Sequence, residues 1–275
     1  MLSSINLKDT ELTTVATGAF DGDVALTALE FPTYLTNVEG TPFSGCTALA
    51  SLTFNTGGAN IGDDSSNYLF DTTAKDALTF LTIKGNYSGT IKAGAFANCT
   101  NLATVTISNG ATFSGTINSV IGANSVENVT FGKVTGTIAA NTFVYAASET
   151  TALTMGEVAS TSIAAAAFNV SASEGDPVVI LGNLTADITN AIITGTTKDG
   201  KASTLTIGDV LVAQTPVILS DKISAAKVGK IGKDAAGTTP ETTVYFNAKA
   251  LGQAEVIYFT GDVSESSKIM NNTEN

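Results

Sequence analysis

A repeating pattern of short apolar segments constrains the fold of this chain more than any other feature. Five segments read apolar-x-x-apolar-x-apolar, and their middle apolar residues are spaced by 23, 29, 24 and 24 residues: Leu29, Leu52, Leu81, Val105 and Val129. Weaker copies follow at Leu153-Thr-Met155, Val179-Ile-Leu181 and Leu205-Thr-Ile207. A period of this length is typical of solenoids, in which each turn buries its apolar side only against neighbouring turns.

Two further elements recur with the same period. A phenylalanine recurs once per turn, usually after a small residue, at Phe20, Phe43, Phe70, Phe96, Phe143 and Phe168. A glycine-initiated stretch ending in isoleucine follows three of the strands, at 85–91, 110–117 and 132–138. We interpret each turn as a half-buried strand, a glycine corner, a second extended stretch that buries its isoleucine, and a tight helical turn that points its phenylalanine inward.

Two segments carry a resemblance to a known family. Residues 91–108 (IKAGAFANCTNLATVTIS) and 35–54 (LTNVEGTPFSGCTALASLTF) are similar to the BspA-like leucine-rich repeats of surface proteins. The resemblance covers 15–107 closely, continues more loosely to residue 207, and fades where the phenylalanine element is lost. It implies a surface-exposed or secreted bacterial protein that binds a host or matrix protein.

The predicted fold is therefore a leucine-rich repeat solenoid, right-handed and β-rich, with a stack of parallel strands joined by short helical or 3-10 turns. We expect about ten turns of about 22–29 residues. A single domain would span 1–275, with an N-terminal cap at 1–14, regular repeats at 15–207, degenerate repeats at 208–263 and a frayed tail at 264–275. Strands are predicted in the degenerate part at Val244-Tyr-Phe246 and Ile257-Tyr-Phe259.

Composition excludes several classes of function. The chain has no histidine and no tryptophan, its 13 basic residues are all lysines, and its net charge is −12. Imidazole catalysis, histidine metal sites and bidentate arginine recognition are therefore impossible, and nucleic acid or an anionic membrane would be repelled. No run of about 20 apolar residues predicts membrane insertion. No signal peptide is visible at 1–11. The family resemblance implies an extracellular or cell-surface protein, and we expect its signal to have been removed.

The two cysteines occupy the same position of the repeat. Cys46 and Cys99 lie two turns apart, with Thr73 at the equivalent place in between. Two strand spacings separate their Cα atoms by roughly 10 Å, whereas a disulfide needs less than about 7 Å. We predict two free, buried thiols.

Three other clusters are judged to be ordinary surface. Residues 195–202 (GTTKDGKA) nearly match a phosphate-binding loop, but Ala202 replaces the hydroxyl residue and a strand follows instead of a helix. Asp21 and Asp23, and residues 63–67 (DDSSN), offer oxygen ligands without the spacing of a calcium loop. The one basic cluster comprises Lys222, Lys227, Lys230 and Lys233.

The outward positions of the predicted strands form the candidate recognition strip. The central outward residues are Glu30, Thr53, Thr82, Thr106, Thr130, Thr154, Ile180 and Thr206. Two positions earlier lie Ala28, Ser51, Phe80, Thr104, Asn128, Ala152, Val178 and Thr204. The predicted strip comprises Glu30, Ser51, Thr53, Phe80, Thr82, Thr104, Thr106, Asn128, Thr130, Thr154, Thr204 and Thr206. Threonine also simply favours exposed sheet faces, so the ladder has a purely structural explanation as well.

These features favour a non-catalytic, adhesin-like binding module that recognises a protein partner through this strip. We expect a monomer without cofactor or metal. Two alternatives remain open: a structural spacer or assembly subunit, and a binder of ice or crystalline glycan through threonines repeated at ~4.8 Å. Carboxylates could still form an acid–base pair, but no spacing in the sequence points to one.

Overall fold

The fold is described from a computed structural model of the chain. The structure describes residues 2–55, 57–63, 68–118, 121–122, 125–148, 151–170, 174, 177–190, 192–193 and 205–212, and the backbone alone of 123–124, 194, 203–204, 223–228, 245–247, 256–259 and 268–270. All statements about structure below refer to these residues.

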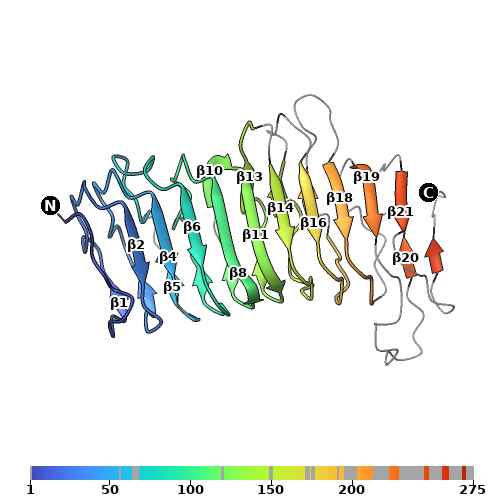
Figure 1. Ribbon diagram of the computed structural model, residues 1–275, viewed down its shortest axis with the longest axis horizontal. Coiled ribbons are helices and arrows are strands. Elements are labelled where there is room, and N and C mark those ends of the chain that lie inside the picture. Colours follow the sequence, from blue (N-terminus) through green and yellow to red (C-terminus); the bar gives the residue numbers. More distant parts are fainter. Residues whose placement is uncertain are drawn as a thin grey trace.

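A parallel sheet of ten strands runs along the whole molecule (Figure 1). In spatial order its strands are β2 (Ala28–Phe31), β4 (Ser51–Phe54), β6 (Phe80–Ile83), β8 (Thr104–Phe113), β11 (Asn128–Val134), β14 (Ala152–Met155), β16 (Val178–Leu181), β18 (Ser203–Ile207), β19 (Ile223–Val228) and β21 (Val256–Phe259). Equivalent residues of neighbouring repeats pair directly, as in Leu29 with Leu52 and Leu52 with Leu81. The predicted stacking of parallel strands is confirmed.

A second parallel sheet lies at the short extended stretches. It has six strands: β1 (Thr14–Val15), β3 (Asn37–Val38), β5 (Asn60–Ile61), β7 (Thr90–Ile91), β9 (Thr116–Ile117) and β12 (Thr137–Ile138). The second residue of each strand is buried, including Ile61, Ile91 and Ile117. The prediction that each of these stretches buries its apolar residue is therefore confirmed.

The side of the solenoid that carries the phenylalanines differs from the prediction. In the first half, Phe20, Phe43, Phe70 and Phe96 lie on hydrogen-bonded turns, and no helix is present among the described residues. In the second half this side is a parallel sheet of four strands: β10 (Ile121–Val126), β13 (Phe143–Tyr145), β15 (Phe168–Asn169) and β17 (Ile193–Thr194). The expected helical turns are thus wrong.

The residues that follow each phenylalanine explain the difference. Asp21-Gly22, Ser44-Gly45 and Asp71-Thr72 are turn formers, because their side chains bond the local backbone or permit positive φ. Val144-Tyr145 and Asn169-Val170 include β-branched and aromatic residues, which favour extended strands.

The interior is a continuous column of apolar side chains along the solenoid. Phenylalanines of successive turns pack ring against ring, with centroids 5.0 Å apart for Phe31 and Phe54 and 5.2 Å apart for Phe143 and Phe168. Each ring is buried by the turns on both sides, so no single turn could hold its own core.

The number of turns is smaller than expected. Eight strands from β2 to β18 leave seven intervals, and about seven turns are supported in place of ten. Strands β19 and β21 extend the main sheet, and β20 (Tyr245–Asn247) pairs with β22 (Lys268–Met270). The strands predicted near residues 244 and 257 therefore correspond to β20 and β21.

Candidate recognition surface

The outward side chains of the main sheet form two straight columns. The Thr column is Glu30, Thr53, Thr82, Thr106, Thr130, Thr154, Ile180 and Thr206. The mixed column is Ala28, Ser51, Phe80, Thr104, Asn128, Ala152, Val178 and Thr204. Backbone pairing sets each residue beside its equivalent in the next strand, so the predicted alignment of the ladder is confirmed.

Both columns face solvent. Every described side chain of the Thr column is exposed or half-exposed, while the residues between the columns, such as Leu52 and Val105, are buried. Five consecutive strands place threonine in register, from Thr53 to Thr154. Because parallel strands lie ~4.8 Å apart, this run offers hydroxyl and methyl groups at one fixed repeat over about 19 Å.

Three large apolar side chains interrupt the polar surface. Phe80 is 49% exposed, and Val178 and Ile180 on β16 are 46% and 40% exposed. The predicted strip included Phe80 but omitted the two residues of β16. A signal was available in the sequence, because Val178-Val-Ile-Leu181 is apolar at every position and a half-buried strand should alternate.

Glu30, on the first strand, is the one charged member of the two columns between β2 and β18. Glu30 Oε1 accepts hydrogen bonds from Lys84 Nζ and Asn55 Nδ2, each at 2.9 Å. The bond from Lys84, and next that from Asn55, lowers the pKa of the Glu30 carboxyl. Sequence reasoning missed this cluster because Lys84 lies 54 residues away, two turns along the sheet.

A second cross-turn pair joins Lys133, near the end of β11, to Glu157, which follows β14. Lys133 Nζ lies 2.9 Å from Glu157 Oε1, which also accepts a bond from Thr185 Oγ1. The Thr185 bond, and then that of Lys133, lowers the pKa of the Glu157 carboxyl. Both clusters are partly exposed, so their ion pairs add little stability. The stretch of the two columns between the clusters carries no charge.

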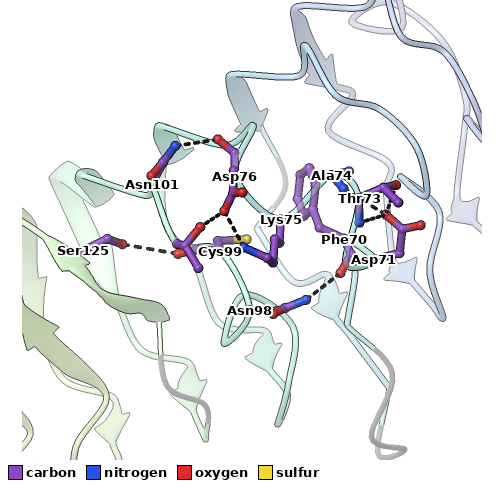
Figure 2. A network of polar contacts seen from close by, with 11 residues as sticks. Phe70, Asp71, Thr73, Ala74, Lys75, Asp76, Asn98, Cys99, Asn101 and Ser125 are labelled. Carbon is purple, nitrogen blue, oxygen red and sulfur yellow. Dashed lines mark hydrogen bonds and ion pairs between the residues drawn. The ribbon is translucent and has the colours of Figure 1, made fainter.

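The opposite corner of the solenoid carries a polar network that links neighbouring turns (Figure 2). Asp71 accepts bonds from Ser44 Oγ and Gly45 N of the preceding turn and from Thr73 and Ala74 of its own. Asp76 likewise accepts from Thr100, and Asn98 Nδ2 donates to the carbonyl of Phe70. These hydrogen bonds hold the turns in the way that helix hydrogen bonds would hold a helix. The network therefore has a structural role, and no binding role is needed to explain it.

The structure describes some of the other sites considered in the sequence and not others. Cys46 and Cys99 are free and fully buried, as predicted, and Cys46 Sγ donates to the Phe20 carbonyl. Asp23 accepts from Leu2 N and Asp63 from Gly40 N, and no three acidic or cysteine side chains converge in the part of the chain that is described. The loop at 195–202, residues 64–67 and Lys222, Lys230 and Lys233 lie outside the described residues.

Comparison with known families decides the class of this solenoid. The sequence matches the family described as BspA type Leucine rich repeat region, in six copies, over residues 1–74 and 66–175. The chain belongs to the BspA-type leucine-rich repeat family. Searches of curated proteins and of solved structures found no match.

Members of the BspA-type family are often adhesin-like surface proteins and are typically non-enzymatic. Within the described residues, no helix combines the length and the hydropathy that a membrane span requires.

Proposed function

We propose that this BspA-type repeat protein is a non-catalytic binding module of a cell surface or the extracellular space, which recognises a protein through the two outward columns. The observation that carries the proposal is the uninterrupted run of threonines from Thr53 to Thr154, on strands β4 to β14 whose inward apolar residues are buried. A packed solenoid holds such a surface rigid, so a partner does not have to order it on binding.

The chemistry of the columns supports contact with a largely neutral partner surface. Threonine offers a hydroxyl that donates and accepts, together with a methyl group, and none of these requires a counter-charge. Phe80, Val178 and Ile180 supply the exposed apolar area that anchors interfaces. Tryptophan and arginine are absent from the sequence and tyrosine is absent from the two columns, so we expect modest affinity spread over many strands.

The test is a binding screen of the purified chain against extracellular-matrix proteins and glycans. The informative variant combines Thr106→Lys with Thr130→Lys, which places two charges at the centre of the Thr column. The matched control combines Thr116→Lys with Thr137→Lys, because these threonines also pair on neighbouring strands, but in the six-stranded sheet.

Three outcomes are distinguishable. Binding that the first pair abolishes and the control pair leaves intact supports the proposal. Binding unaffected by the first pair moves recognition to the corners or the ends of the solenoid. No binding by the unmodified chain favours a structural spacer.

A periodic ligand is the second candidate, and the same run of five threonines favours it. Hydroxyl groups at ~4.8 Å could match the repeat of a crystalline glycan or of ice. Glu30 and Ile180 end the run on either side, which limits the matching surface to five strands. Pull-down on insoluble glycan and a thermal hysteresis measurement test this candidate, and a negative result in both rejects it.

A further inference from the structure

The two outward columns are complementary to themselves. We propose that the partner recognised by this surface is a second copy of the same chain, bound face to face with the two solenoids antiparallel. The inference rests on the proposed function, because it assigns a partner to the same surface.

The symmetry is visible when strands are counted outward from β11, the fifth strand of the ten. Two strands before it, β6 carries Phe80 in the mixed column, and two strands after it, β16 carries Val178 in the same column. These are two of the three large apolar side chains that the described strands expose, and the third, Ile180 of β16, would lie over Thr82 of β6. A two-fold axis through β11, parallel to the strands, would therefore place each Phe80 on the partner's Val178.

The polar positions follow the same rule. One strand from the centre, Thr106 of β8 corresponds to Thr154 of β14. Three strands from the centre, Thr53 of β4 corresponds to Thr206 of β18, and Ser51 to Thr204. Hydroxyl groups would thus meet hydroxyl groups, each of which can donate to the other.

The ends of the face are matched by backbone register, since β19 is described by its backbone alone. Four strands from the centre, Glu30 of β2 corresponds to the Thr-column position of β19, where Lys227 pairs with Thr206. In the mixed column the same two strands carry Ala28 and Ala225. By register, an acidic residue therefore corresponds to a basic one and alanine to alanine. Glu30 itself bonds Lys84 and keeps 37% of its side chain exposed.

The alternative parallel arrangement lacks this match. If the solenoids lay parallel, every strand would face its own copy with its direction reversed, so Phe80 would face the polar Thr82 and Glu30 would face Ala28. Antiparallel packing is an isologous contact, in which each contact occurs twice.

The area available is small but sufficient for a weak dimer. Nine strands at ~4.8 Å and four residues at ~3.3 Å give a face of roughly 560 Å², or about 1,100 Å² for two copies. Stable interfaces begin near about 1,200 Å², so the dimer should be concentration-dependent.

Cross-linking at the symmetry axis tests the arrangement directly. Asn128 is exposed in the mixed column of β11, so the two copies of Asn128→Cys would face each other across the ~10 Å between packed sheets. A short bismaleimide should link them into a covalent dimer. The native Cys46 and Cys99 are fully buried and should not react.

Ala28→Cys is the matched control, since Ala28 is exposed in the same column four strands away. Its two copies would be ~38 Å apart along the sheet in the antiparallel dimer, too far for a short bismaleimide to link. Linking of Asn128→Cys but not of Ala28→Cys supports the proposal. Equal linking of both indicates parallel solenoids and overturns it, and so does failure of both at high concentration.

Sedimentation equilibrium of the full chain provides the second measurement. Phe80→Asp should lower the association constant at least about tenfold, because each dimer loses two apolar contacts and gains two buried charges. An unchanged constant overturns the proposal.

A monomeric wild-type chain would overturn only this inference if the Thr106→Lys and Thr130→Lys pair still abolishes capture of another protein. If that pair affects neither measurement, the recognition surface itself is wrong.

Discussion

Ser108 combines an unfavourable backbone conformation with a buried hydroxyl group that has no hydrogen-bond partner among the described residues. It follows the buried Ile107, at the position that Gly132 takes in the next repeat. Its φ is 52°, in the left-handed region that side chains other than glycine seldom adopt. Its side chain is fully buried, and its hydroxyl has no hydrogen-bond partner among the described residues.

Replacing this serine should therefore stabilise the protein. We expect Ser108→Gly to raise the free energy of unfolding by about 1 kcal/mol, because it removes backbone strain and an unsatisfied hydroxyl that together outweigh the entropy cost of glycine. Urea denaturation measures the change. Ser160→Ala is the control, since Ser160 Oγ donates to the Gly136 carbonyl and accepts from Ser162 N, and this substitution should destabilise instead.

Gly115 shows the opposite constraint, in which only the absence of a side chain permits the stacking. A Cβ atom added at Gly115 would lie 2.2 Å from the Gly89 carbonyl oxygen of the preceding turn. We expect Gly115→Ala to lower the free energy of unfolding by about 2–3 kcal/mol, because backbone must move.

The matched control for this prediction is Gly58→Ala. The nearest atom to an added Cβ at Gly58 is Ser88 Oγ at 3.8 Å, an ordinary contact, and its φ is outside the left-handed region. Thermal or urea unfolding should show little change for Gly58→Ala. Equal losses in both variants would mean that the close approach at Gly115 does not limit the stacking.

Among the elements, the strands could be predicted and the phenylalanine-bearing side could not. Leu52, Leu81 and Val105 repeat with the same flanking pattern, and period-2 alternation leads directly to a half-buried strand. The phenylalanines repeat equally well in both halves, yet Phe43 lies on a turn and Phe143 begins a strand. Both a turn and a strand can point one phenylalanine into the core, so the residues that follow the phenylalanine decide which of the two forms.

Asp71 stabilises one of these turns in a manner that depends on pH. Burial raises the pKa of its carboxyl, but hydrogen bonds from Thr73, Gly45, Ser44 and Ala74 outweigh this and lower the pKa from 3.8 to about 2. The folded state therefore favours the carboxylate. Its stabilising contribution is present above about pH 4 and is lost as the pH falls toward 2.

Removing this charge should flatten the acid end of the stability profile. We expect Asp71→Asn to lower the free energy of unfolding at pH 7 by about 1 kcal/mol, since the carboxylate is partly exposed. Between pH 4 and pH 2 the variant should lose less stability than the unmodified chain. Urea unfolding at these pH values measures both effects, and identical losses below pH 4 would contradict the assignment.

At the scale of the whole molecule, sequence reasoning located the outward columns but not their relation to each other. The position of Thr106 in its strand follows from local alternation, whereas the pairing of Lys227 with Thr206 depends on the register across an irregular connection. The contact between Lys84 and Glu30 likewise depends on the register of three turns. Properties that depend on several turns together, including the symmetry about β11, became visible only in the assembled sheet.

A solenoid of this kind has no contacts between distant turns, so its turns need not open together. The two thiols report on this, because both are fully buried and Cys46 lies nearer the N-terminal end than Cys99. Burial raises the pKa of Cys46 to about 11 and that of Cys99 to about 12, so at pH 8 neither should react until its turn opens.

We expect alkylation of Cys46 to require a smaller opening free energy than alkylation of Cys99, because the phenylalanine turns of Phe20, Phe43 and Phe70 precede that of Cys99, whereas only the Phe20 turn precedes that of Cys46, so fewer turns have to open from the N-terminal end. Labelling with iodoacetamide in a series of sub-denaturing urea concentrations, followed by mass spectrometry of the two peptides, measures both free energies against the unfolded chain. Scaling each rate to that of the unfolded chain removes the difference in reactivity between the two sites. Equal opening free energies with the same urea dependence would instead mean that the stacked core, from Phe20 to Phe168, opens as one cooperative unit.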